Sequence, residues 1–235
     1  FQPLPPSEAP SHRVVILEPG VELVYHAQHP NPDEPNSCCM STYLLGPIEG
    51  GVAGRSCRLA LLVDLMSQPA FNQLRTKEQL GYIVWCTRAV LDGIESLSIT
   101  VQSKDHSADF LATRIEAFLS EFSGYLRTIE PDVFRSHVAS LVARYRESDK
   151  NIGEEYSRHL SELSRRGKQG GYRWQRAEEQ AQAIERLSIE EVISFFEQDL
   201  GVSRRAGLSV RVSGPKAVNV EPAQILQEFR GQDVD

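Results

Sequence analysis

The stretch LRTKEQLGYIVW, residues 74–85, places three charged helix formers, Arg75, Lys77 and Glu78, before a Gly-Tyr pair and a run of strand formers. Long charged side chains are favourable in a helix, whereas Ile, Val and Trp favour strands. Glycine tolerates the backbone angles of a tight turn. The stretch therefore predicts a helix, a turn at Gly81 and a strand.

The strand after Gly81 is predicted to form a hairpin. Residues 82–91, YIVWCTRAVL, are rich in β-branched and aromatic side chains, and Asp92 with Gly93 is a hairpin turn signal. Residues 95–102, ESLSITVQ, alternate strictly between apolar and polar. This alternation predicts a second strand that buries one face. Its apolar residues are Leu97, Ile99 and Val101.

Upstream of this stretch, the pattern predicts strands and then a helical region. The strands are expected at residues 13–18, 21–28 and 37–46. Apolar residues take up helical spacing from 51 to 65, and Pro69 predicts a break or the start of a second helical segment. That second segment is expected to end near Gln79.

Downstream, a series of helical regions and a last strand are predicted. The helical regions are residues 107–129, a segment starting at Pro131, and residues 153–165 and 172–186. Ser188 and Glu191 form an S-x-x-E capping box ahead of a further helix. Leu208, Val210 and Val212 face one way in the strand 207–213, and residues 223–229 suit a short helix.

Strands at both ends and in the middle, with paired helices between them, favour a single mixed sheet. We predict an α+β fold of two layers, a mixed and mostly antiparallel sheet with helices packed on one face. Residues 1–12 contain four prolines and are expected to be a linker. The domain is expected to span residues 13–214, and residues 215–235 form a tail with one short helix.

Composition limits the partners of this chain. Its 235 residues are 40% hydrophobic and 24% charged, as in ordinary globular proteins. A net charge of −7 opposes binding to a phosphate backbone, so nucleic acid is not an expected partner. The longest apolar runs, such as residues 59–63, are far shorter than the roughly 20 residues of a membrane span.

The four cysteines, Cys38, Cys39, Cys57 and Cys86, lack the C-x-x-C spacing of metal and redox motifs. We expect free thiols, which indicates a reducing compartment, and the cytoplasm is the default location, with an organellar form as the alternative. The N-terminus has neither an initiator Met nor an apolar signal core, so we interpret the chain as a fragment.

Two histidines, His26 and His29, are spaced as H-x-x-H. Zinc pairs on a helix need a spacing of four, and this segment is predicted to be the end of a strand, in which the two rings point to opposite faces. A metal site at this pair is therefore a weak hypothesis. His137 lies beside an apolar helix stripe and is expected to be a partly buried structural residue.

Residues 69–85, PAFNQLRTKEQLGYIVW, closely resemble the signature of the last domain of the insulin-degrading enzymes, zinc peptidases of the pitrilysin or M16 family. The resemblance continues through DGIESLSITVQS (92–103) and TRIEAFLSEF (113–122), and more weakly to the last predicted strand. It implies the metallohydrolase fold shared with LuxS and the mitochondrial processing peptidases. It also implies a large peptidase whose domains close over a substrate chamber.

In that family the zinc site is an H-x-x-E-H motif with a distal Glu in the first domain, and this chain has no H-x-x-E-H. The resemblance therefore implies a C-terminal domain without zinc ligands, inactive as a fragment. Zinc is bound elsewhere in the full-length enzyme. The family's last domain reaches the active site through an Arg and a Tyr, which correspond to Arg75 and Tyr82. Their chemistry suits substrate binding and oxyanion stabilisation.

Residue type and spacing alone favour structural roles, with Arg75 near a helix C-terminus and Tyr82 packing in a strand. The resemblance reverses this preference. Lys77, Glu78 and Gln79 are expected to be solvated or to support the helix. Expected partners are a peptide substrate and the N-terminal half of the same polypeptide, with a second copy of the chain as a further candidate.

The segment 143–155 is not strongly basic, which argues against activation by polyanions. The alternative function is a non-catalytic scaffold or interaction domain derived from a duplicated peptidase domain.

Overall fold

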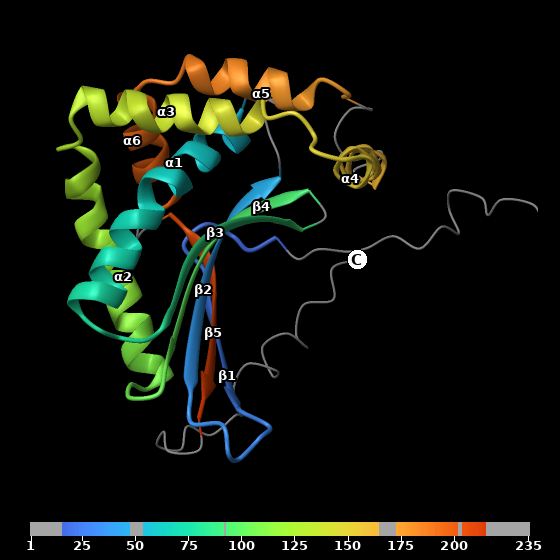
Figure 1. Cartoon of the computed structure of the whole chain (residues 1–235). Helices are drawn as coiled ribbons and strands as arrows, with labels where there is room; N and C mark the ends of the chain where they lie inside the picture. Colours follow the sequence, from blue (N-terminus) through green and yellow to red (C-terminus); the bar gives the residue numbers. More distant parts are fainter. Residues whose placement is uncertain (1–15, 48–53, 92, 165–172, 202–203, 215–235) are drawn as a thin grey trace, which may run out of the picture.

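The computed structural model describes residues 16–47, 54–91, 93–164, 173–201 and 204–214 (Figure 1). The strands are β1 (Glu22–Gln28), β2 (Ser37–Pro47), β3 (Ile83–Leu91), β4 (Ile94–Ser103) and β5 (Ala206–Ser213). The helices are α1 (Arg55–Ala70), the π-helix η1 (Phe71–Lys77), α2 (Ala108–Leu126), α3 (Pro131–Tyr145), α4 (Ile152–Ser164), α5 (Arg176–Glu185) and α6 (Ile189–Asp199). The linker 1–12, the tail 215–235 and its expected helix lie outside the described residues.

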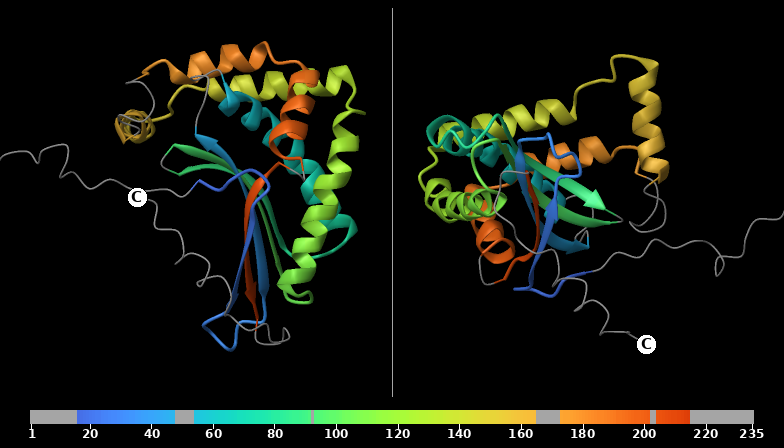
Figure 2. Two further views of the ribbon diagram at one scale, coloured as in Figure 1. Left: turned by 180° about the vertical axis from the view of Figure 1, so that it is seen from behind. Right: turned by 90° about the horizontal axis from the view of Figure 1, so that it is seen from below.

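The strands form one sheet in the order β1-β5-β2-β4-β3. β1 and β5 are parallel, and the other three pairings are antiparallel. α1 and α2 pack on the sheet, and α3, α5 and α6 pack against α1 or α2. Figure 2 shows these helices on one side of the sheet and α4 standing apart at the end of α3. The predicted two-layer α+β fold is confirmed.

The hydrophobic core lies between the sheet and the helices. Leu97, Ile99 and Val101 of β4 are completely buried there, as the alternation predicted. From α1, Leu61 and Leu62 reach the same core, and Phe122 of α2 packs edge-on against Phe196 of α6. The hairpin β3-β4 is confirmed, and Gly93 in its turn has a φ of +87°.

β5 alternates as predicted, but its apolar side chains do not face the helices. Leu208 pairs with Thr42, whereas Ser209 pairs with the buried Ser41 of β2. Paired residues share a face, so Leu208, Val210 and Val212 lie on the helix-free face. Apolar alternation identified the strand but not the face that the helices cover.

Two local predictions need correction. Residues 16–18 were expected in a strand, but they have no regular structure and the first strand begins at Glu22; residues 13–15 lie outside the described part. Pro69 does not end the first helix, because it lies within α1. The second helical segment begins at Phe71 as a π-helix.

Candidate functional site

The candidate site is built on the change from helix to strand between Phe71 and Ile83. The amide of Glu78 donates to the carbonyl oxygen of Gln73 at 3.0 Å, and the amide of Leu80 donates to that of Leu74 at 3.0 Å. Leu74 and Leu80 are buried, so they anchor the segment to the core. Gln79 between them has a φ of +53°, a left-handed conformation that is uncommon outside glycine. Two backbone hydrogen bonds and two buried leucines therefore fix the conformation of this turn.

Gly81 is required by a close approach. A β-carbon at this position would lie 1.8 Å from the carbonyl oxygen of Gln102 on β4. The sequence predicted a turn here, but the physical reason for glycine is that its backbone lies directly against the backbone of β4 just before the chain enters β3. This backbone contact fixes the position of the next residue, Tyr82, directly before β3.

Arg75 and Tyr82 are brought together by this turn. The guanidinium carbon of Arg75 lies 4.5 Å from the ring centre of Tyr82 and 4.6 Å from that of Phe71. Arg75 is thus stacked between two aromatic faces, a cation–π arrangement. Tyr82 is 81% exposed, so its phenol faces solvent, and Arg75 is half-buried.

Phe71 is a site residue that the sequence reasoning missed. It stands four positions before Arg75 in the helix, a spacing that places side chains side by side. An aromatic residue at that spacing from an arginine was the available signal.

Glu78 holds the turn to a neighbouring helix. Arg114 on α2 donates to both carboxylate oxygens of Glu78, at 2.6 and 2.9 Å, and Gln73 donates to one of them at 2.8 Å. The hydrogen bonds from Arg114 lower the pKa of Glu78 below its usual value. Glu78 therefore has a structural role across two elements, while Lys77 and Gln79 are exposed.

A hollow of about 470 Å³ opens beside Arg75 and Tyr82. It is lined by residues of η1, β3 and β4 and of the loops beside them: Asn36, Arg75, Gln79, Gly81, Tyr82, Ile83, Gln102, Lys104 and Asp105. Arg75 and Lys104 supply positive charge and Tyr82 supplies a hydroxyl. This set can bind a polarised carbonyl or an oxyanion, because each of the three is a hydrogen-bond donor.

The histidines and cysteines that the structure describes form no metal centre together. Nδ1 of His26 lies 3.9 Å from Asp109, whereas Nδ1 of His29 bonds the backbone of Asn31 at 3.1 Å, so the two rings have different partners. No group of three or more His, Cys, Asp or Glu that could hold a metal occurs within the described ranges. His137 is partly buried and bonds Asp64 at 2.7 Å, which confirms its predicted structural role.

All four cysteines are free thiols, as predicted. Burial raises the pKa of Cys57 to about 11 and that of Cys86 to about 12. Neither is an activated nucleophile. The helices that the structure describes include none long and apolar enough to cross a membrane.

Comparison with known proteins relates this chain to a group of peptidases. The family described as PQQ synthase PqqF-like, C-terminal lobe domain 4, matches residues 61–160. The peroxisomal insulin-degrading enzyme-like 1 of Arabidopsis thaliana is 30% identical over 91% of this chain, and the human insulin-degrading enzyme is 28% identical over 99%. The putative zinc protease mug138 of Schizosaccharomyces pombe is 31% identical over 83%. The chain is a homologue of the M16 peptidases.

The chain corresponds to only part of these M16 relatives. It spans 19–22% of their length, about one domain of each. The solved structure of pitrilysin matches 89% of the chain with a TM-score of 0.75 at 21% identity, and the chain covers 22% of that protein. A Pseudomonas fluorescens structure described as a peptidase M16 inactive domain matches with a TM-score of 0.59 at 14% identity. These structures share the fold.

Proposed function

We propose that this chain is the C-terminal domain of a zinc metalloendopeptidase that degrades enclosed peptides. It forms part of the wall of the substrate chamber, and Arg75 and Tyr82 complete an active site whose zinc is bound in another domain. The observation that carries this proposal is the stacked pair itself: a guanidinium held between two rings, next to an 81% exposed phenol at the rim of a hollow.

Folding alone does not account for this arrangement. A large aromatic side chain gains little stability when most of its surface remains in water. Gln79 adds a backbone conformation that costs of order 1–3 kcal/mol. Residues held this way by a rigid scaffold are typical of binding and catalytic loops. The positions of Tyr82 and Arg75 are explained if both side chains contact a ligand that approaches from outside the chain.

The chemistry of the pair suits peptide hydrolysis in which the nucleophile comes from elsewhere. Arg75 would bind a substrate backbone carbonyl through its fork of donors, and the Tyr82 hydroxyl would donate to the oxyanion as it develops. Among the described residues that line the hollow, Asp105 is the one carboxylate, beside the cations Arg75 and Lys104, and a single carboxylate is too few ligands for a zinc site. Zinc, when bound by the other domain, would activate the attacking water.

The other expected properties follow from this proposal. The partners are a peptide substrate and the N-terminal half of the same polypeptide, and a homo-oligomer is possible within it. The separate origin of the zinc and the Arg–Tyr pair means that the site is complete only when the chamber closes. The four free thiols support the cytoplasm as the location.

The test is Tyr82→Phe in the full-length protein, assayed with an internally quenched peptide. Phenylalanine keeps the ring on Arg75 and removes only the hydroxyl. Loss of one oxyanion donor lowers kcat by about 10²- to 10³-fold. KM should change little. Tyr125→Phe on α2, where the tyrosine is 43% exposed, is the matched control and should leave kcat unchanged. An unchanged kcat in Tyr82→Phe would refute the assigned role.

A second function is favoured by one observation, the similarity to a domain described as inactive. On this alternative the chain is a non-catalytic scaffold or interaction domain. The two functions are distinguished by zinc analysis of the full-length protein, together with its sequence upstream of this chain. An H-x-x-E-H motif with stoichiometric zinc supports the peptidase, and the lack of both supports the scaffold.

A further inference from the structure

β3 is an edge strand with an unpaired backbone edge and exposed apolar side chains. It pairs with β4 on one side, and no backbone hydrogen bond joins its other side to any residue that the structure describes. Trp85 is 59% exposed and Val90 is 51% exposed along this strand. An edge of this kind offers unpaired N–H and C=O groups to another extended chain.

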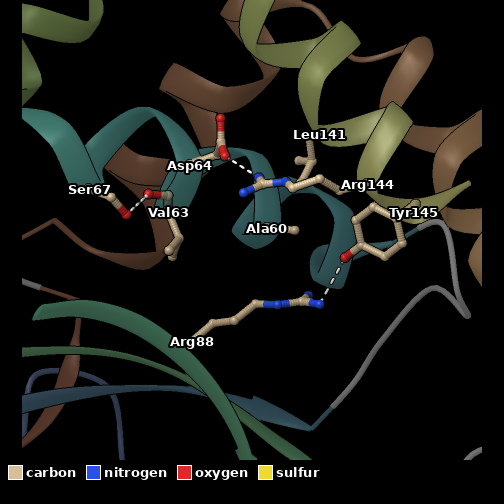
Figure 3. Close-up of a pocket in the computed structure, with 8 residues that line it drawn as sticks. All are labelled: Ala60, Val63, Asp64, Ser67, Arg88, Leu141, Arg144 and Tyr145. Atoms are coloured by element: carbon tan, nitrogen blue, oxygen red, sulfur yellow. Dashed lines mark hydrogen bonds and ion pairs between the residues drawn. The ribbon is translucent and has the colours of Figure 1, made fainter. Parts of the chain in front are cut away.

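Two hollows follow this edge on the side of the helices. The first, drawn in Figure 3, has a volume of about 380 Å³ and lies between α1, α3 and β3, with Arg88, Arg144 and Tyr145 around it. The second has a volume of about 540 Å³ and includes Phe71 and Trp85. Both hollows include Asp64 and Ser67, so they adjoin. We call the two together the edge groove.

The two ends of the edge groove differ in chemistry. Phe71, Val84 and Cys86 give the second hollow an apolar side. Trp85 adjoins this hollow, but its side chain points to the opposite face of the sheet, since Val84 pairs with the buried Val101 and Trp85 is the next residue along the strand. In the first hollow, Asp64 is paired with Arg144 and with His137. Arg88 instead donates to two uncharged oxygens, the backbone carbonyl of Ser56 at 3.2 Å and the Tyr145 hydroxyl at 2.8 Å. The positive charge of Arg88 therefore has no carboxylate partner in the described part of the chain.

We propose that the edge groove binds an extended peptide segment as an additional strand beside β3. The segment places an apolar side chain in the hollow at Phe71 and Cys86 and a carboxylate side chain at Arg88, two positions along β3 from Cys86. Side chains two positions apart in a strand lie on the same face, separated by about 7 Å. Backbone hydrogen bonds to β3 would give affinity, and the two hollows would give sequence preference.

The edge groove begins at the candidate site. Phe71 lines the second hollow and also stacks on Arg75, so a peptide in the groove would continue into the hollow of Arg75 and Tyr82. For this reason a peptide is the occupant that we infer, rather than a second copy of the chain. The inference rests on the proposed function only for the choice of a peptide substrate.

The test uses the 235-residue chain, labelled with ¹⁵N, and capped seven-residue peptides of threonine that carry one phenylalanine and one glutamate two positions apart. Peptides with these two residues in either order cover both strand directions. Binding should shift amide signals of β3. Replacing the glutamate by glutamine should weaken binding about tenfold, which corresponds to the loss of one charge-assisted contact.

Two variants and two modified peptides locate the contact. Arg88→Gln should abolish the preference for glutamate over glutamine, whereas Arg135→Gln, at an exposed position on α3, should preserve it. N-methyl groups at odd or at even positions of the peptide separate the two backbone faces. An added strand bonds an edge through alternate residues, so one series should lose binding and the other should retain it.

Three results would overturn the proposal: no binding at millimolar peptide, equal binding of the two N-methyl series, or equal binding of the glutamate and glutamine peptides. Dimerisation of the chain through β3 without peptide binding would also overturn it. These readouts need neither zinc nor turnover. If the chain binds the peptides but Tyr82→Phe leaves kcat unchanged, the edge groove is supported and the proposed function is refuted.

Discussion

Replacing Gly81 by alanine tests the contact that places Tyr82 beside Arg75. The new β-carbon would lie 1.8 Å from the carbonyl oxygen of Gln102 and 2.8 Å from its carbonyl carbon. Both atoms belong to the backbone of β4, so no side-chain rotation can relieve the overlap. The chain at residue 81 must move away from the sheet.

The size of the effect follows from these distances. Non-bonded contacts of a β-carbon are not found below 3.0 Å, so the backbone at residue 81 must withdraw from Gln102 by more than 1 Å. Overpacking of this kind costs about 1–3 kcal/mol, and more where the backbone is the obstacle. We expect a loss of about 3 kcal/mol in the free energy of unfolding. For a chain of this size that lowers Tm by about 6–12 °C.

Urea unfolding of the isolated chain, followed by circular dichroism, measures this change. Gly124→Ala is the matched control, because nothing lies within 4 Å of its β-carbon position and the residue is in α2. Alanine is favoured over glycine in a helix by about 0.5–1 kcal/mol. The same substitution should therefore destabilise at one position and stabilise at the other.

The reasoning on Gly81 fails if Gly81→Ala unfolds within about 0.5 kcal/mol of the original chain, the range of ordinary surface changes. It also fails if the variant is destabilised but the amide signals of β3 and of Gln102 do not move. In that case the loss of stability would not come from the backbone contact between residue 81 and β4.

Three further predictions concern stability and reactivity. Glu78→Gln should lower the free energy of unfolding by about 1–2 kcal/mol at pH 7, because it removes a charged partner of Arg114. The pKa of Glu78 is depressed in the folded chain, so this difference should be fully present at neutral pH. It should begin to shrink as urea unfolding is repeated below about pH 4, the ordinary pKa of a glutamate, and be lost as the pH falls through the lower pKa of the folded chain. Ser188→Ala should cost about 1 kcal/mol in the same assay, since it removes the hydrogen bond that the Ser188 hydroxyl accepts from the amide of Glu191. Cys57 and Cys86 should react with a thiol reagent at pH 8 only after unfolding, because burial raises the pKa of both thiols.

The local elements were predictable because each depends on neighbours in the sequence. The alternation of Leu97, Ile99 and Val101 requires a strand whose apolar face is buried, and the structure buries all three. The capping box at Ser188 and Glu191 is complete within four residues, and both of its hydrogen bonds are present. Patterns that span only a few neighbouring residues can be interpreted without knowledge of the fold.

The environment of the candidate site depended on distant parts of the chain. Arg114 lies 36 residues after Glu78, and their contact exists only because α2 packs beside the turn. The Gln102 carbonyl that makes Gly81 necessary is likewise set by the register of β3 and β4. The sequence indicated which residues to examine, but the reasons for their placement are tertiary.

Phe71 connects the stacked arginine with the edge groove, and this has a consequence for how tightly Arg75 is held. Cation–π contacts contribute about 0.5–1 kcal/mol each when exposed and about 2 kcal/mol or more when desolvated. With Tyr82 81% exposed, the stack on Arg75 is at the weaker end in the free chain. A peptide side chain that packs on Phe71 would exclude water from that ring and strengthen the stack. Occupation of the groove and the orientation of Arg75 would then be coupled, so that a bound peptide would itself help to order the arginine that binds it.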